Sequence, residues 1–134
     1  MPPKIEFAFL AEYALSTNNR LSAMMSLDRL VLPEIPGVAS FYVAGILLLE
    51  VGAIYSVSTT LLVKTAGESS PKQLIKTIPG RINIRDIRTE SGISRRALAV
   101  PFHNILFEQP GEYMVEIVVD DLCVHTLALE IEQK

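Results

Sequence analysis

The sequence is poor in the residues that usually mark an active site or a metal site. Its single cysteine excludes an intramolecular disulfide and a thiolate metal cluster built from one chain, and is typical of a reducing, cytoplasmic compartment. The seven glycines are scattered singly, so no glycine-rich loop is present to cradle a phosphate. The Gly-x-Ser-x-Gly and His-Glu-x-x-His motifs of hydrolases are missing too. We therefore expect no cofactor and no metal, and a non-catalytic protein rather than an enzyme.

Long hydrophobic runs are also missing. The longest is Phe41–Leu49, which ends at Glu50, whereas a helix that spans a bilayer needs ~20 residues. A longer window that includes Glu50 gives the alternative of a membrane helix, which would carry a costly carboxylate. The N-terminus has neither the basic start nor the apolar run of a signal peptide. We expect no membrane partner, and we expect residues 41–49 to form a central strand that is covered on both faces.

The sequence is rich in apolar residues, which make up 49% of the 134, while 20% are charged. This composition argues against disorder, and the length suits one domain with its own core, spanning residues 1–134. Apolar and polar residues alternate at a period of two over most of the chain, which is typical of half-buried strands. A helix over 20–32 is the alternative at one place, because Ala, Met and Leu favour helices. The predicted strands are 5–13, 21–27, 41–49, 55–63, 82–87, 98–107, 113–119 and 123–131. We predict an all-β fold, an antiparallel β-sandwich of about eight strands.

The register of the last two strands follows from which residues must be buried. A plain two-residue turn at Asp120-Asp121 would place Val119 opposite Leu122 and would turn Glu130 into the core. The other set of alternate residues contains three large aliphatics, each worth roughly 1.5–3 kcal/mol when buried. That set is Cys123, His125, Leu127, Leu129 and Ile131. We therefore predict a three-residue loop, Asp120 to Leu122, or an equivalent bulge, with positive φ at Asp121 or Leu122.

Both ends of the chain resemble a family of small bacterial proteins of unknown function. The opening strand, Ile-Glu-Phe-Ala-Phe-Leu-Ala-Glu-Tyr-Ala at 5–14, is similar to the Phe-Leu-Ala-Asp-Tyr-Ala-like strand of that family. The Pro-Gly-Glu-Tyr turn at 110–113 and Val119-Asp120-Asp121 are similar to its closing hairpin, although Asp121 stands where Gly is usual. The resemblance implies an immunoglobulin-like sandwich and supplies no activity. In such sandwiches a tyrosine placed like Tyr113 ties a neighbouring loop through its hydroxyl; the alternative is a hydroxyl in water.

The charges are unevenly distributed although the net charge is only −3. Residues 64–96 carry eight basic and three acidic residues, a net +5, and the remainder carries four basic and twelve acidic residues, a net −8. Five arginines make this region a candidate anion-binding site, since guanidinium groups hold phosphate or carboxylate through paired hydrogen bonds. They are Arg81, Arg85, Arg88, Arg95 and Arg96, and Arg81 and Arg85 would share one face of an extended strand. The acidic chain, and the lack of aromatics at 81–96, argue against nucleic acid. Pairing with acidic residues of the same chain is the alternative.

The chain has two histidines, His103 and His125, and the pair Cys123 and His125 lies two residues apart. These residues suggest a thiol or metal-dependent hydrolase, because a nucleophile needs a base within hydrogen-bond distance. A metal site needs three or four ligands, and no further ligand occurs at a recognisable spacing. The alternative is that Cys123 and His125 line the end of the core. We therefore expect no catalytic residue here.

Taken together, the sequence predicts a protein that works by association. Apolar residues are abundant and no convincing site is present, and open sheet edges are natural surfaces for pairing with another chain. We expect it to self-associate as a homo-oligomer or to bind another protein. An anion-binding module at arginines 81–96 is the second hypothesis, and a small hydrolase that uses the histidines and Cys123 is the third.

Overall fold

The structure, a computed structural model, describes residues 2–64, 72–77 and 79–134, and in these residues it is all strand and loop, with no helix. Residues Asn18 and Asn19, both with positive φ, turn the chain between the first two strands. The strands are β1 (Lys4–Thr17), β2 (Arg20–Leu27), β3 (Arg29–Leu32), β4 (Gly37–Glu50), β5 (Ile54–Val63), β6 (Lys72–Lys76), β7 (Gly80–Asn83), β8 (Ile93–Phe107), β9 (Gly111–Val119) and β10 (Leu122–Gln133). The helix considered for 20–32 is therefore wrong.

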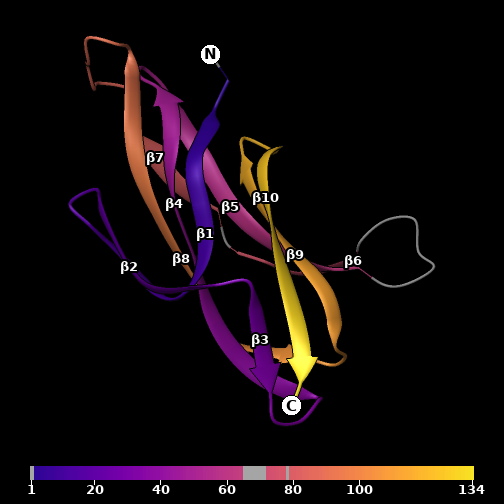
Figure 1. Cartoon of the computed structure of the whole chain (residues 1–134). Coiled ribbons are helices and arrows are strands. Elements are labelled where there is room, and N and C mark those ends of the chain that lie inside the picture. The colour runs from indigo at the N-terminus through magenta and orange to yellow at the C-terminus, as the bar shows by residue number, and fades with distance from the viewer. Residues whose placement is uncertain (1, 65–71, 78) are drawn as a thin grey trace.

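The strands form two sheets that are not closed into a barrel (Figure 1). The first sheet has the order β2-β1-β4-β8, and the second has the order β3-β10-β9-β5-β6, with β7 also paired to β5. The prediction of purely antiparallel pairing is wrong at one place, since β3 runs parallel to β10. β3 follows β2 after one residue, Asp28, whose carbonyl oxygen accepts a hydrogen bond from the Glu130 N–H, so the chain passes directly from one sheet to the other.

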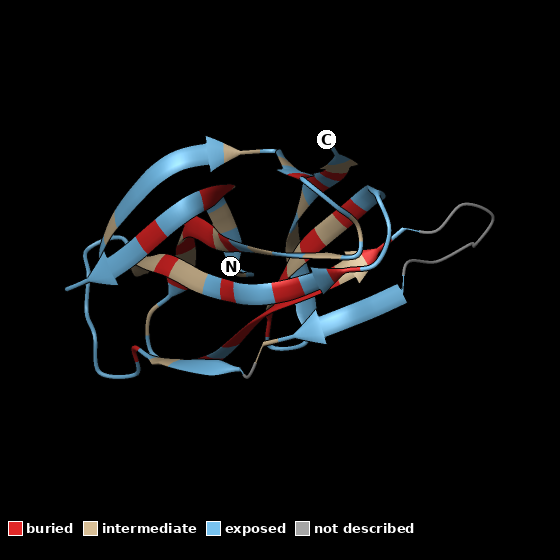
Figure 2. Cartoon of the chain, turned by 90° about the horizontal axis from the view of Figure 1, so that it is seen from below, coloured by how far each residue is buried: buried red, intermediate tan, exposed pale blue. Residues whose placement is uncertain are grey.

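The core is made of large apolar side chains from both sheets. Buried positions alternate with exposed ones along most strands, as Figure 2 shows. The largest fully buried side chains include three aromatic rings, and Phe41 and Phe102 stack with ring centroids 4.9 Å apart. Burial of this kind is worth about 1.5–3 kcal/mol for each large side chain, so the core is the main source of stability. The largest fully buried side chains are Leu10, Phe41, Val43, Leu47, Leu49, Leu61, Ile84, Phe102, Phe107, Ile117, Leu129 and Ile131.

The most apolar run of the sequence is a central strand, as predicted. β4 lies between β1 and β8, and its alternate residues Val43, Leu47 and Leu49 are fully buried in the core. Its other side is only partly buried, for example at Tyr42 and Ile46, so the predicted cover on both faces is complete on one face alone. Among the described residues, no helix has the length and apolar character needed to cross a membrane.

The closing hairpin reaches the predicted faces by a bulge. Val119 pairs with Leu122 across a two-residue turn, Asp120-Asp121, in which both residues have positive φ. The register then shifts between Cys123 and His125. The three-residue loop is therefore wrong and the equivalent bulge is confirmed. Because the shift comes after Cys123, that side chain is exposed rather than in the core, and His125 and Leu127 are half buried while Leu129 and Ile131 are buried.

Candidate interaction surface

One side of β1 carries large apolar side chains that the core does not cover. Phe7, Phe9, Ala11, Tyr13 and Leu15 are alternate residues, so they project from the same side of the strand. Tyr42 of β4 lies opposite Ala11, and Met24 of β2 lies opposite Tyr13. We call the set Phe7, Phe9, Tyr13, Leu15, Met24 and Tyr42 the β1 face. The other side of β1 faces the core with Leu10 and Ala14.

Aromatic contacts connect the side chains of the β1 face. The rings of Phe7 and Phe9 stack with centroids 6.2 Å apart. Tyr13 meets Tyr42 edge to face at 5.2 Å, and Tyr42 meets the His103 imidazole at 5.4 Å. Such pairs contribute about 0.5–1.5 kcal/mol beyond the area they bury. The contacts therefore hold the rings in fixed positions, although Phe7 is 42% exposed and Tyr13 45%.

The exposed area of this surface is larger than isolated surface hydrophobes explain. Leu15 is 47% exposed and Met24 63%. Together with Phe7 and Tyr13 they expose on the order of 400 Å², taking side-chain areas of ~150–250 Å². A patch of this size is comparable to the largest apolar patch on a typical monomeric protein, which is often a contact site for another molecule.

The β1–β2 hairpin is held against β8 by polar contacts at its tip. In Figure 1 the tip lies to the left of β8. The Asn19 side-chain amide donates to the Arg95 carbonyl oxygen at 2.7 Å, and its oxygen accepts from the Ala97 N–H at 2.7 Å. The Arg95 guanidinium also pairs with the Glu6 carboxylate at 2.7 Å. These contacts fix the hairpin and cover backbone groups of the edge strand β8.

The structure divides the five candidate arginines among three places. Arg81 lies on β7, Arg85 and Arg88 lie in the connection between β7 and β8, and Arg95 and Arg96 lie on β8. The expected shared strand face for Arg81 and Arg85 is wrong. β7 ends at Asn83, because the Asn83 side-chain oxygen accepts the Arg85 N–H at 3.1 Å and turns the chain.

Intrachain partners account for two of these arginines. Arg95 pairs with Glu6, and the Arg96 Nε donates to the Ser94 hydroxyl at 3.0 Å. Arg81, Arg85 and Arg88 are exposed and form no ion pair with a described carboxylate. Within the part of the chain that the structure describes, three guanidinium groups therefore have no ion-pair partner that an anion would have to displace.

The histidines and the cysteine do not form a catalytic group. His103 lies on β8 against Tyr42, in the first sheet, and His125 lies on β10, in the second. The Cys123 thiol donates to the His125 carbonyl oxygen at 3.7 Å, not to its imidazole. Burial raises the pKa of Cys123, with Glu116 adding to the rise, which is the opposite of an activated thiol. No group of three side chains able to hold a metal occurs among the described residues.

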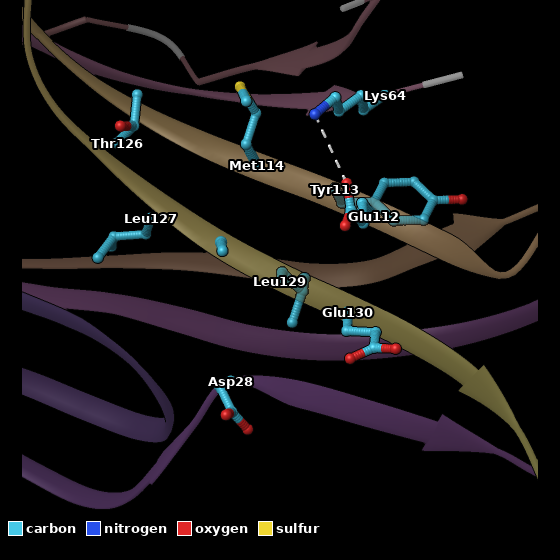
Figure 3. Close-up of a pocket in the computed structure, with 10 residues that line it drawn as sticks. Asp28, Lys64, Glu112, Tyr113, Met114, Thr126, Leu127, Leu129 and Glu130 are labelled. Atoms are coloured by element: carbon cyan, nitrogen blue, oxygen red, sulfur yellow. Dashed lines mark ion pairs between the residues drawn. The ribbon is translucent and has the colours of Figure 1, made fainter. Parts of the chain in front are cut away.

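An open hollow of about 480 Å³ lies on the second sheet (Figure 3). Lys64 and Glu112 form an ion pair there at 3.7 Å, and Asp28 and Glu130 lie on the side of β3. Met114 and Thr126 complete much of the lining. Lys64 is thus already paired with a carboxylate, and neither cysteine nor histidine occurs in the described lining of the hollow.

Sequence reasoning missed the β1 face, although a signal for it was present. Residues 5–15 are apolar on both sides of the strand apart from Glu6 and Glu12. This pattern fits a strand covered on both sides and a strand with one exposed apolar side equally well. The register shift between Ile5 and Phe7 decides which side is covered, because it puts Ile5 half buried and Phe7 exposed despite their spacing of two. Nothing local in the sequence marks that shift.

Two packed sheets place the chain in the class of small all-β domains. The model of a family of unknown function, DUF6941, matches residues 6–132, and the chain belongs to this family. No curated protein matches the chain. Among solved structures, the chain is similar to Pseudomonas fluorescens alkylpurine DNA glycosylase AlkC bound to DNA containing an abasic site analog, with a TM-score of 0.58 and 14% identity. That match covers 97% of this chain and 30% of the glycosylase chain, so this chain spans less than a third of its length, and at this identity the likeness concerns the fold alone.

Proposed function

We propose that this protein is a non-catalytic, immunoglobulin-like β-sandwich that works by binding a protein surface through the β1 face. The immunoglobulin-like assignment is supported by Tyr113, whose hydroxyl donates to the Gln109 carbonyl oxygen, four residues upstream, at 2.7 Å. A tyrosine in this position, tied to the backbone just before its strand, is a hallmark of such sandwiches. The exposed thiol of Cys123, without a second cysteine in the chain, supports a cytoplasmic location.

The observation that carries the proposal is a set of exposed apolar side chains whose aromatic rings pack against one another. Tyr13 and Met24 lie directly opposite each other on β1 and β2, and both are exposed. Covering them would remove apolar area from water at about 25 cal/mol per Å². Because the rings already pack against one another, little side-chain entropy is lost when a partner covers them. The site is thus suited to binding.

A photo-crosslinking amino acid placed at Leu15 in living cells tests this function. Leu15 is 47% exposed and lies on the β1 face, and Leu122 is 55% exposed on the tip of the β9–β10 hairpin and provides the control. We expect protein adducts from position 15 and none from position 122, with the linked peptide identified by mass spectrometry. Equal adducts from both positions, or none from position 15, would contradict the proposal.

Anion binding is a second candidate, and the free arginines favour it. Arg81, Arg85 and Arg88 form no ion pair with a described carboxylate, so no intrachain partner needs to be displaced. Inorganic polyphosphate at low salt should then raise the melting temperature, and replacing the three arginines by glutamine should abolish the rise. An equal rise in the substituted protein would place the anion elsewhere and remove this candidate.

A further inference from the structure

We propose that the open edge of the second sheet, formed by β6 and β7 along β5, takes up an acidic, extended segment of another polypeptide as an added antiparallel strand. This edge belongs to the second sheet and the β1 face to the first, so its partner is additional to the one in the proposed function. β6 pairs with residues 60–63 of β5 and β7 with residues 54–57, so the two short strands follow each other along β5. Val57 pairs with Val119 of β9 on one side and with Gly80 of β7 on the other. Neither β6 nor β7 pairs with a further strand in the part of the chain that the structure describes.

Backbone groups of this edge point outward at two defined residues. The Thr77 N–H donates to a β5 carbonyl oxygen at 2.9 Å. Because the groups of successive strand residues point to opposite edges, those of Lys76 point away from β5. Ser56 of β5 uses its own N–H and C=O for bonds to Asp120, on the side away from β7. Its partner on β7, Arg81, therefore also directs its N–H and C=O outward. An extended peptide pairs with such groups when it adds to the edge of a sheet.

The side chains along this edge favour a partner that carries carboxylates. Residues 72–77 and 79–83 contain three basic residues, Lys72, Lys76 and Arg81, and no acidic one. All three are exposed and form no ion pair with a described carboxylate. Lys76 lies opposite Thr60 and Arg81 opposite Ser56, so both project from the same face of the sheet, four β5 residues apart. Two glutamates four residues apart on an added strand would meet them.

The same charges argue against a second copy of this edge as the partner. Two β6 strands paired side by side would bring the lysines of one copy, Lys72 and Lys76, close to those of the other. Like charges opposite each other destabilise a pair of strands. Lysines on an edge are one means by which proteins prevent unwanted pairing. They discriminate against neutral and basic strands and favour an acidic one, which makes the edge specific.

A second hollow, beside β6, can hold apolar side chains of the added strand. It measures about 400 Å³ and lies between β6 and the end of β8. The register shift in the β5–β6 pair leaves Leu74 without a β5 partner, and Leu74 and Ile75 both line the hollow although they are consecutive. Leu106 of β8, also in the lining, is 53% exposed, and Lys72 and Glu108 are its charged members. Since alternate residues of a strand point to opposite faces, the neighbours of the glutamates would point toward this hollow and should be aliphatic.

Fluorescence polarisation with a synthetic peptide tests the inference on the full-length chain. The probe is fluorescein-labelled Val-Glu-Val-Thr-Val-Glu-Val, and we expect saturable binding at low salt. Lys76→Glu and Arg81→Glu should each weaken binding by about 10-fold or more, because each places a carboxylate opposite a glutamate. The matched control is Arg88→Glu, which changes an exposed arginine outside the edge and should alter binding by less than about 3-fold. Leu106→Ser should weaken binding by about 5-fold through loss of apolar contact.

Methylation of the peptide's amide nitrogens separates strand addition from attraction between charges. Because the groups of Lys76 point outward, the glutamate opposite it pairs through its own N–H. Methyl groups on the nitrogens of the two glutamates and the threonine should therefore abolish binding, while methyl groups on the valine nitrogens should leave it. Equal binding of the two methylated peptides, or unchanged binding to Lys76→Glu and Arg81→Glu, would overturn the inference. So would a lack of binding of the plain peptide up to about 1 mM. The crosslinking result at Leu15 concerns the other sheet, so the proposed function stands or fails separately.

Discussion

Gly45 is the residue at which the packing of β1 on β4 can be tested most directly. It is buried in the middle of β4, opposite Ala8 of β1. The register shift between Ile5 and Phe7 brings the backbone of β1 close to it. A Cβ built at Gly45 would lie 2.7 Å from the Phe7 carbonyl oxygen and 3.0 Å from the Ala8 Cβ. Since these neighbours belong to the backbone or lie next to it, no side-chain rotation can relieve the contact.

The expected cost of Gly45→Ala follows from two opposing effects. Overpacking of a core typically costs about 1–3 kcal/mol. Replacing glycine by alanine also reduces the entropy of the unfolded chain, which stabilises by about 0.4–1 kcal/mol. With the middle of both ranges, the net destabilisation is about 1.3 kcal/mol. For a domain of this size, that lowers the melting temperature by roughly 4–8 °C.

Gly80→Ala is the matched control, because Gly80 also lies in a strand and no atom of a described residue crowds the position of its added Cβ. A Cβ there would lie 3.9 Å from the Val57 carbonyl oxygen, which is an ordinary contact. We expect its melting temperature to equal or exceed that of the unsubstituted chain, for the entropic reason alone. Thermal unfolding followed by circular dichroism measures both variants. If Gly45→Ala proved as stable as Gly80→Ala, the close approach of β1 to β4 and the register shift that causes it would be refuted.

Three further predictions concern single side chains. Tyr113→Phe should cost about 1 kcal/mol through loss of the bond to Gln109, while Tyr42→Phe, whose hydroxyl bonds no described residue, should cost nothing. Burial raises the pKa of Tyr113 above its ordinary 10.0, so the neutral tyrosine stabilises the fold below pH 10 and this contribution is lost as the pH rises through the raised pKa. The difference in free energy of unfolding between the unsubstituted chain and Tyr113→Phe, measured in urea, should therefore shrink above pH 10. A difference that stays the same would contradict this. The raised pKa of Cys123 means less thiolate at a given pH, so alkylation at pH 8 should be slower than for a free cysteine peptide, and faster alkylation would contradict the raised pKa. Asp121→Gly should stabilise the fold by up to about 1 kcal/mol, because Asp121 has a φ of 65° that glycine adopts without strain. Thermal unfolding should give a melting temperature no lower than that of the unsubstituted chain.

The parts of the fold that the sequence predicts are those set by neighbouring residues. The alternation at 113–119 predicts β9, and Asn18-Asn19 predicts the first turn through the tolerance of asparagine for positive φ. Tyr113 was expected to tie a neighbouring loop, and its bond to Gln109 confirms this. In each case the interaction that decides the structure spans only a few residues, so the sequence alone contains it.

The parts that the sequence does not predict depend on contacts between distant residues. Asn19 binds the backbone of β8 across 76 positions. β7 ends just before Ile84, whose side chain is buried and whose backbone forms hydrogen bonds with Gly52 and Ala53. Met25 has a φ of 57° in the middle of a strand, a conformation that methionine rarely adopts. No local pattern marks these features, and they decide which arginines are separated and which side of β1 is exposed.

The same contacts indicate why association should use a face of the first sheet rather than its edges. Asn19 occupies backbone groups of β8, and Pro101 removes a donor from the same strand. At the opposite edge, the positive φ of Met25 interrupts the regular backbone of β2. Natural sheets use such features to prevent another strand from pairing at an edge. Because both edges of this sheet are interrupted in the described residues, we expect the proposed association to use the exposed rings and Met24 of the β1 face, through side-chain packing rather than strand addition.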